Sequence, residues 1–87
     1  MAKPHHNLVV WKRSLGFVTQ IYRMTAQFPS EERFGLVSQM RRAAVSIPSN
    51  IAEGAARNTR KEFTNLLFIA QGSASELETQ MLISREH

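Results

Sequence analysis

The amino-acid sequence predicts an all-α protein that folds as an up-and-down antiparallel helical bundle. Apolar residues recur at spacings of three and four along most of the chain, which is the pattern of amphipathic helices, and no segment alternates as a half-buried strand would. With 87 residues, of which 43% are hydrophobic and 21% charged, the chain has the size and composition of one globular domain. We therefore expect residues 1–87 to form a single domain of three helices.

Helix one is predicted over about residues 7–27, with Asn7 as its N-cap. Its helical wheel carries two adjacent apolar stripes, one of Leu8, Trp11, Leu15, Val18 and Tyr22 and one of Val10, Phe17, Ile21 and Met24. An apolar arc this wide is typical of a helix that packs against two neighbours in a bundle. We accordingly expect Trp11 and Tyr22 to lie in the core.

Helix two is predicted over about residues 31–54, with Ser30 as its N-cap. Its apolar positions keep their helical period through Pro48, although proline removes one backbone hydrogen bond and clashes with the preceding turn. The unbroken period predicts one helix that is kinked near Pro48. The alternative is a break at that point, with Asn50 and Glu53 capping a fresh turn.

Helix three is predicted over about residues 60–84, because Thr59 and Glu62 form the T-x-x-E pattern of a capping box. A glycine in the interior of a helix costs roughly 1 kcal/mol relative to alanine, so Gly72 needs a reason such as close approach of another backbone. The side opposite the core stripe holds Phe68, Gly72 and Ser75. We infer a second packing face on this helix.

The polar side of helix two carries short side chains, namely Ser46, Ser49, Asn50 and Glu53. A solvent-facing side more often carries long Lys and Glu, whereas short polar groups permit close contact between helices. These four residues, together with Phe68, Gly72 and Ser75, are the candidate subunit-interface residues. Within such a contact Glu53 is expected to pair with Arg42 or Arg57.

Oligomerisation is expected because a domain this small buries a limited core. The chain has no cysteine, so disulfides are excluded, and its histidines do not form a liganding pair at helical spacing, so no metal site is predicted. His5 and His6 are expected to lie in a disordered tail. No apolar run reaches the roughly 18 residues of a membrane span. We expect a cytoplasmic protein with no membrane partner.

Charge is distributed unevenly around a formal net charge of +4. Residues 33–61 are basic and residues 62–87 are acidic. Clustered Arg and Lys bind phosphate through bidentate pairing and counterion release. The candidate nucleic-acid-binding residues are Arg41, Arg42, Arg57, Arg60 and Lys61. The alternative is a solvated face with complementary contacts between chains.

No catalytic arrangement is predicted, and no cofactor. Ser46 and Ser49 have no histidine nearby in sequence and no nucleophile elbow around them. Glu76 and Glu78 are two residues apart, so on a helix they point in different directions and cannot act as an acid–base pair. Gly54 lacks the neighbouring glycines and lysine of a phosphate loop. The sequence therefore favours binding over catalysis.

The stretches "FPSEERFGLVSQMRRAAVSIPSNIAEGAAR", "KEF" and "GSASELETQ" resemble the four-helix-bundle family encoded in intervening sequences of bacterial 23S rRNA genes. That family is in turn similar to the accessory variability protein of diversity-generating retroelements. The resemblance covers about residues 8–84. It implies subunits that assemble into a ring-shaped homopentamer with a basic surface and no enzymatic activity. It also implies nucleic acid and a reverse-transcriptase-like protein as partners.

One departure from the family is that its members continue into a fourth helix, whereas this chain ends at "ISREH", where a turn is expected. We therefore expect the fourth helix to be absent from this chain. The predicted function is a non-enzymatic homo-oligomer that acts as a nucleic-acid or ribonucleoprotein adaptor. The alternative is a structural or protein-interaction ring that binds no nucleic acid.

Overall fold

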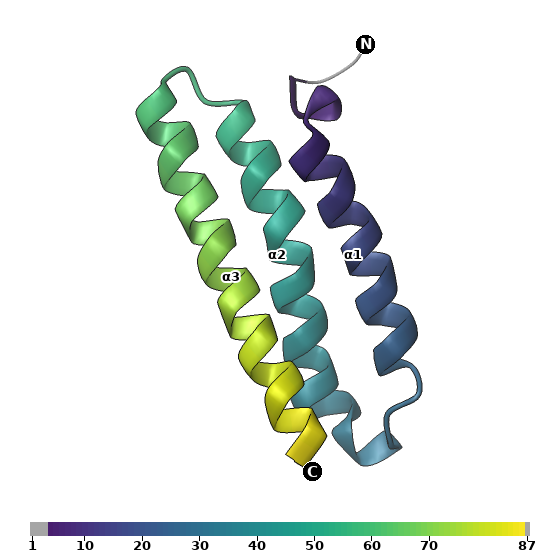
Figure 1. Ribbon diagram of the computed structural model, residues 1–87. Helices are drawn as coiled ribbons and strands as arrows, with labels where there is room; N and C mark the ends of the chain where they lie inside the picture. The colour runs from purple at the N-terminus through teal and green to yellow at the C-terminus, as the bar shows by residue number, and fades with distance from the viewer. Residues whose placement is uncertain (1–3, 87) are drawn as a thin grey trace.

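The computed structural model describes residues 4–86 and contains three α-helices in that range: α1 (Val9–Thr25), α2 (Ser38–Ala55) and α3 (Arg60–Glu86). Neighbouring helices run antiparallel, and α2 lies between α1 and α3 (Figure 1). No strand forms among these residues, which confirms the all-α prediction. None of the described helices is both long and apolar enough to span a bilayer.

The start of α1 differs from the predicted one. A 3₁₀-helix spans Pro4–Asn7, and the N-cap of α1 is Leu8, whose backbone carbonyl accepts a hydrogen bond from Lys12 N at 3.1 Å. Asn7 therefore does not cap α1. The short helix is held by aromatic packing, because the His5 and His6 rings lie 4.6 and 5.2 Å from the Trp11 ring, centroid to centroid. The expectation of a disordered tail is wrong for these two histidines.

The entry to α2 also departs from a regular α-helix. Glu32 N donates to the Pro29 carbonyl at 3.0 Å, which makes a 3₁₀ turn over Ser30–Glu32. A single π-helical turn, Arg33–Val37, follows before α2 begins at Ser38. Ser30 thus belongs to the reversal after α1 and does not cap α2. A 3₁₀ turn is frequent at the end of a helix, whereas a π-helical turn is rare.

Helix α2 continues through Pro48 to Ala55, so the alternative of a break is wrong. Proline has no N–H to give to the carbonyl four residues back. Two side chains supply hydrogen bonds on the same turns: Ser49 Oγ donates to Val45 O at 2.9 Å, and Asn50 Nδ2 donates to Ser46 O at 2.7 Å. The short polar residues around Pro48 therefore serve the backbone of their own helix. A kink at Pro48 stays a prediction.

The core contains one cluster to which all three helices contribute. Its buried members are Ile21, Met40, Ala43, Ala44 and Leu77. The other stripe of α1 is only half covered, since Leu15 and Tyr22 are each 42% exposed. The prediction that Tyr22 lies in the core is therefore wrong.

Helices α2 and α3 approach closely at Gly54. A Cβ at this position would lie 2.8 Å from Phe63 Cδ1 and 3.0 Å from Leu66 Cβ, so glycine is required for the packing observed. Just beyond the turn, Thr59 Oγ1 accepts a hydrogen bond from Glu62 N at 3.2 Å. This bond confirms the predicted cap of α3.

Candidate nucleic-acid interface

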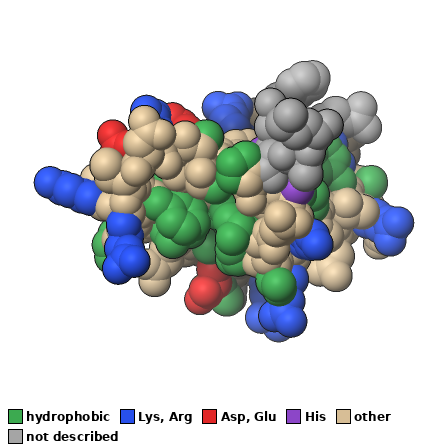
Figure 2. Space-filling view, turned by 90° about the horizontal axis from the view of Figure 1, so that it is seen from above, with side chains coloured by type: hydrophobic (Ala, Val, Ile, Leu, Met, Phe, Trp, Pro, Cys, Tyr) green, Lys and Arg blue, Asp and Glu red, His purple; other side chains and the backbone are tan. Residues whose placement is uncertain are grey.

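The turn between α2 and α3 gathers three of the predicted basic residues at one end of the bundle. Arg57, Arg60 and Lys61 lie within five positions of one another, and all three are exposed. Arg57 Nη2 is 2.7 Å from Glu53 Oε1, so one of the three cations is paired, with the predicted partner. Figure 2 looks onto this end and shows Lys and Arg side chains projecting around its rim, with hydrophobic side chains between them.

Arg42 lies apart from this group. It is thirteen residues before Ala55, the last residue of α2, which at a rise of 1.5 Å per residue is about 20 Å. Its side chain is exposed, and its Nη2 donates to Ser38 Oγ at 3.2 Å. The predicted basic residues therefore do not form one continuous surface.

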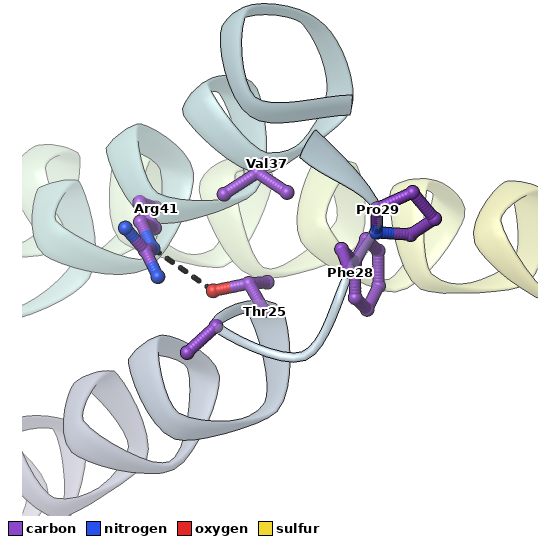
Figure 3. Close-up of a pocket in the computed structure, with 6 residues that line it drawn as sticks. Thr25, Phe28, Pro29, Val37 and Arg41 are labelled. Atoms are coloured by element: carbon purple, nitrogen blue, oxygen red, sulfur yellow. Dashed lines mark hydrogen bonds between the residues drawn. The ribbon is translucent and has the colours of Figure 1, made fainter. Parts of the chain in front are cut away.

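Arg41 is engaged within the fold (Figure 3). Its Nε donates to Thr25 Oγ1 at 2.9 Å, and its Nη2 donates to the Tyr22 carbonyl at 3.2 Å. The guanidinium carbon also lies 4.5 Å from the centroid of the Tyr22 ring, a cation–π distance. Thr25 is 2% exposed, and its hydroxyl in turn donates to the Ile21 carbonyl at 2.7 Å.

The position of Arg41 has an electrostatic reason. Its guanidinium lies against the last turn of α1, where the helix dipole favours a cation. A pocket of about 280 Å³ beside it is lined by Thr25, Phe28, Pro29, Val37 and other residues, so the arginine forms one wall where α1 meets α2 (Figure 3). Arg41 thus ties two helices together, and it presents fewer free donors to a phosphate than Arg42 does.

The predicted interface residues fall into two groups on different helices. On α2, Ser46 Oγ donates to the Ala43 carbonyl at 2.7 Å, and Ser49 and Asn50 likewise donate to carbonyls of the same helix. Glu53 accepts from Arg57, just beyond the end of α2. On α3, Phe68 is 64% exposed, and apart from its two chain neighbours and the nearby backbone of its own helix no atom of the described chain lies within 4 Å of a Cβ built on Gly72. Ser75 is exposed on the same helix. The α3 group therefore has no contact in the described chain that accounts for its composition.

Gln80 is a buried polar residue that sequence reasoning missed. It is 6% exposed, and its Nε2 donates to Gln39 Oε1 at 3.5 Å and to Glu76 Oε1 at 3.4 Å. A glutamine on the edge of an apolar stripe gives no sequence signal for such a contact, because Gln39 lies on another helix. This network joins α2 to α3 and marks a polar edge of the core.

The part of the chain that the structure describes contains no candidate metal site. No three His, Cys, Asp or Glu side chains in it lie close enough together to bind one ion. The candidate site is therefore a surface of cations and exposed apolar side chains.

Comparison with known proteins bears on the whole chain. No curated protein matches it. A model of the 23S rRNA-intervening sequence proteins matches residues 6–87, which is nearly the entire sequence and includes all three helices. The chain therefore belongs to the family of 23S rRNA-intervening sequence proteins.

Proposed function

We propose that the protein is a non-enzymatic, cytoplasmic homo-oligomer that binds RNA or DNA through the basic end of its bundle. The observation that carries this proposal is the gathering of Arg57, Arg60 and Lys61 at the α2–α3 turn. Resemblance to the family supplies the number of subunits, which is five. It also implies a four-helix bundle to which the three helices seen here contribute.

The first turn of α3 gives the proposal its physical basis. Helix dipoles disfavour cations at the N-terminus by about 0.3–1 kcal/mol each, yet Arg60 and Lys61 open α3. A phosphate bound beside them would reverse this unfavourable interaction. Such contacts neutralise the phosphate backbone without reading bases, so binding should be tolerant of sequence and sensitive to salt.

The composition of the interface follows from the geometry. Arg60 and Lys61 form its centre, Arg57 contributes while sharing its charge with Glu53, and Arg42 lies at a distance along α2. Arg41 is left out, because two of its nitrogen atoms donate within the chain.

The proposal is tested with the double variant Arg60→Glu/Lys61→Glu in nucleic-acid titrations at several salt concentrations. Loss of two phosphate contacts should reduce the slope of log affinity against log salt by about 2. The matched control is Arg23→Glu/Arg85→Glu, which changes net charge by the same amount at the other end of the bundle. Equal loss of binding in both variants would mean that net charge alone is responsible, and binding indifferent to salt would contradict the proposal.

The second candidate is a scaffold ring that contacts other proteins and no nucleic acid. The exposed apolar side of α3, with Phe68 64% and Ile83 46% exposed, favours it. By resemblance, its partner would be a reverse-transcriptase-like protein. The mass of the particle in solution distinguishes the adaptor from the scaffold ring, because only the adaptor should gain mass when RNA or DNA is added at low salt.

A further inference from the structure

A polar pocket lies between α2 and α3, away from the basic end of the bundle. It has a volume of about 280 Å³, and its lining residues are Gln39, Arg42, Ala43 and Ser46 of α2 with Ser73 and Glu76 of α3. Three of these side chains are short, so the two helices leave space between them that no large side chain fills. The three longer ones, Gln39, Arg42 and Glu76, are exposed at its border.

The two charges of this pocket are opposite, yet they do not pair with each other. Arg42 Nη2 donates along its own helix to Ser38 Oγ at 3.2 Å, and Glu76 Oε1 accepts from Gln80 Nε2 at 3.4 Å. No ion pair within 4 Å joins Arg42 to Glu76 in the described chain. A guanidinium has five N–H donors and a carboxylate accepts about four hydrogen bonds. Most of the hydrogen-bonding capacity of both residues is therefore free.

A buried acceptor without a donor lies beside this pocket. Gln80 is 6% exposed, and its Oε1 has no hydrogen-bond partner in the described chain. Its Nε2 donates to Gln39 Oε1 and Glu76 Oε1, which both belong to lining residues. Turning the amide over would bring its oxygen against the Glu76 carboxylate, so the observed orientation is favoured. Since buried polar groups are nearly always paired, Gln80 Oε1 calls for a donor from a bound molecule.

The hydrogen bonds that cover the Gln80 amide are weak enough to rearrange. They measure 3.5 Å to Gln39 Oε1 and 3.4 Å to Glu76 Oε1, whereas a typical N–H···O bond measures about 2.9 to 3.0 Å. Gln39 and Glu76 are exposed and lie outside the core cluster. A small rotation of either side chain therefore admits a donor to Gln80.

We propose that this pocket binds a small zwitterion of the free α-amino acid class. The ammonium group of the ligand donates to the Glu76 carboxylate and to Gln80 Oε1, and its carboxylate accepts from the Arg42 guanidinium. Charge-assisted hydrogen bonds of this kind are about twice as strong as neutral ones. A simple anion would be repelled by Glu76 and a simple cation by Arg42, so a ligand that carries both charges fits best. This site is separate from the basic end and does not depend on nucleic-acid binding.

The proposal is tested by titrating the native protein with each of the standard α-amino acids and following the side-chain amide signals of its glutamines by ¹H–¹⁵N NMR. The Gln80→Met variant identifies the signal of Gln80 by its loss. Acetate and methylammonium are the matched control ligands, because each carries one of the two charges. We expect at least one amino acid to shift the Gln80 signal in a saturable way. It should bind at least tenfold more tightly than either control.

Two variants of the pocket, Arg42→Gln and Glu76→Gln, should each weaken this binding at least tenfold. Their matched controls are Arg13→Gln and Glu78→Gln, which remove the same charges at exposed positions that do not line the pocket. The control variants should keep the affinity within twofold. All four side chains are exposed, so the variants should fold, and circular dichroism checks that they do.

Several results would overturn the zwitterion site. One is the absence of a saturable shift with every amino acid, and another is acetate or methylammonium binding as tightly as the amino acids do. Equal loss of affinity in Glu78→Gln would mean that net charge alone is responsible. Coupling of Arg42 to Glu76 in a double-mutant cycle of the ligand-free protein would show that the two residues pair with each other instead.

Discussion

The two sides of α3 differ in burial, although both carry apolar side chains. Its inner side holds Ala70 and Leu77, which are 5% and 1% exposed against the rest of the bundle. Its outer side holds Phe68 and Ile83, which are 64% and 46% exposed. Both sides are apolar enough to pack, but only the inner one is covered by the described chain.

Two glycines sharpen the same comparison. Gly54 of α2 faces the inner side of α3 and cannot become alanine without contact closer than 3.0 Å to Phe63. Gly72 lies on the outer side and has open space around it. A glycine in a helix thus marks close packing only where a neighbour is present. At Gly72 no such neighbour is present in the described chain.

The largest expected difference is between Leu77→Ala and Phe68→Ala. The first removes a fully buried side chain and should lower the free energy of unfolding by about 2 to 5 kcal/mol. The second removes an exposed side chain, so it should change mainly the dependence of unfolding on protein concentration. Urea unfolding curves, recorded over a hundredfold range of protein concentration, measure both the free energy of unfolding and its dependence on protein concentration. A loss of equal size in the two variants, independent of concentration, would contradict the comparison.

A second contrast sets Arg41 against Arg42, neighbours in sequence that point in different directions. Arg41→Ala removes a charged donor from the buried Thr25 hydroxyl and should cost about 1.5 to 3 kcal/mol of stability. Arg42→Ala should change stability by less than about 0.5 kcal/mol, as surface substitutions usually do. Thermal unfolding at low ionic strength distinguishes them. Similar effects would show that Arg41 does not hold α1 to α2.

The third contrast is between the two glycines. Gly54→Ala should destabilise by about 1 to 3 kcal/mol through overpacking against Phe63 and Leu66. Gly72→Ala should stabilise the isolated helix by about 1 kcal/mol but weaken association of chains. Gly16→Ala is the control, since a Cβ there also meets nothing within 4 Å and Gly16 is not among the candidate interface residues. Stronger association of the Gly72 variant would contradict a subunit interface at Gly72.

The smallest effect is expected on the exposed side of α2. Glu53 and Arg57 pair at 2.7 Å, but their side chains are 52% and 48% exposed. Glu53→Gln should therefore cost no more than about 0.3 to 0.5 kcal/mol, the value of exposed pairs four residues apart. Loss of the Glu53 charge should also leave Arg57 without its ion pair and so raise the affinity for nucleic acid slightly at low salt. A large loss of stability would show that Glu53 belongs to a contact absent from the single chain.

Much of the fold follows from local pattern, and the rest depends on partners far apart in sequence. The helical period predicts all three helices, and the Thr59–Glu62 pattern predicts the start of α3. The contact between Arg41 and Thr25 joins residues sixteen positions apart on different helices, so no spacing rule reveals it. Tyr22 lies in an apolar stripe, yet exposure depends on how many neighbours α1 has. A period cannot give that number.

The candidate site was less predictable than the fold for a related reason. Sequence places Arg41 and Arg42 side by side, but on a helix consecutive side chains diverge by about 100°, and only one of them remains at the surface with its charge available. Arg60 and Lys61 are also consecutive on a helix, but both stay exposed because they form the first turn of α3 at the end of the bundle.

The most direct test of a nucleic-acid-binding homo-oligomer is its mass in solution by light scattering, at low and high salt, with and without a mixed pool of RNA and DNA. We expect a multiple of the 9.9 kDa chain that persists at high salt and gains mass from the pool only at low salt. A single 9.9 kDa chain under all conditions, or a ring whose mass the pool never changes, would contradict this account.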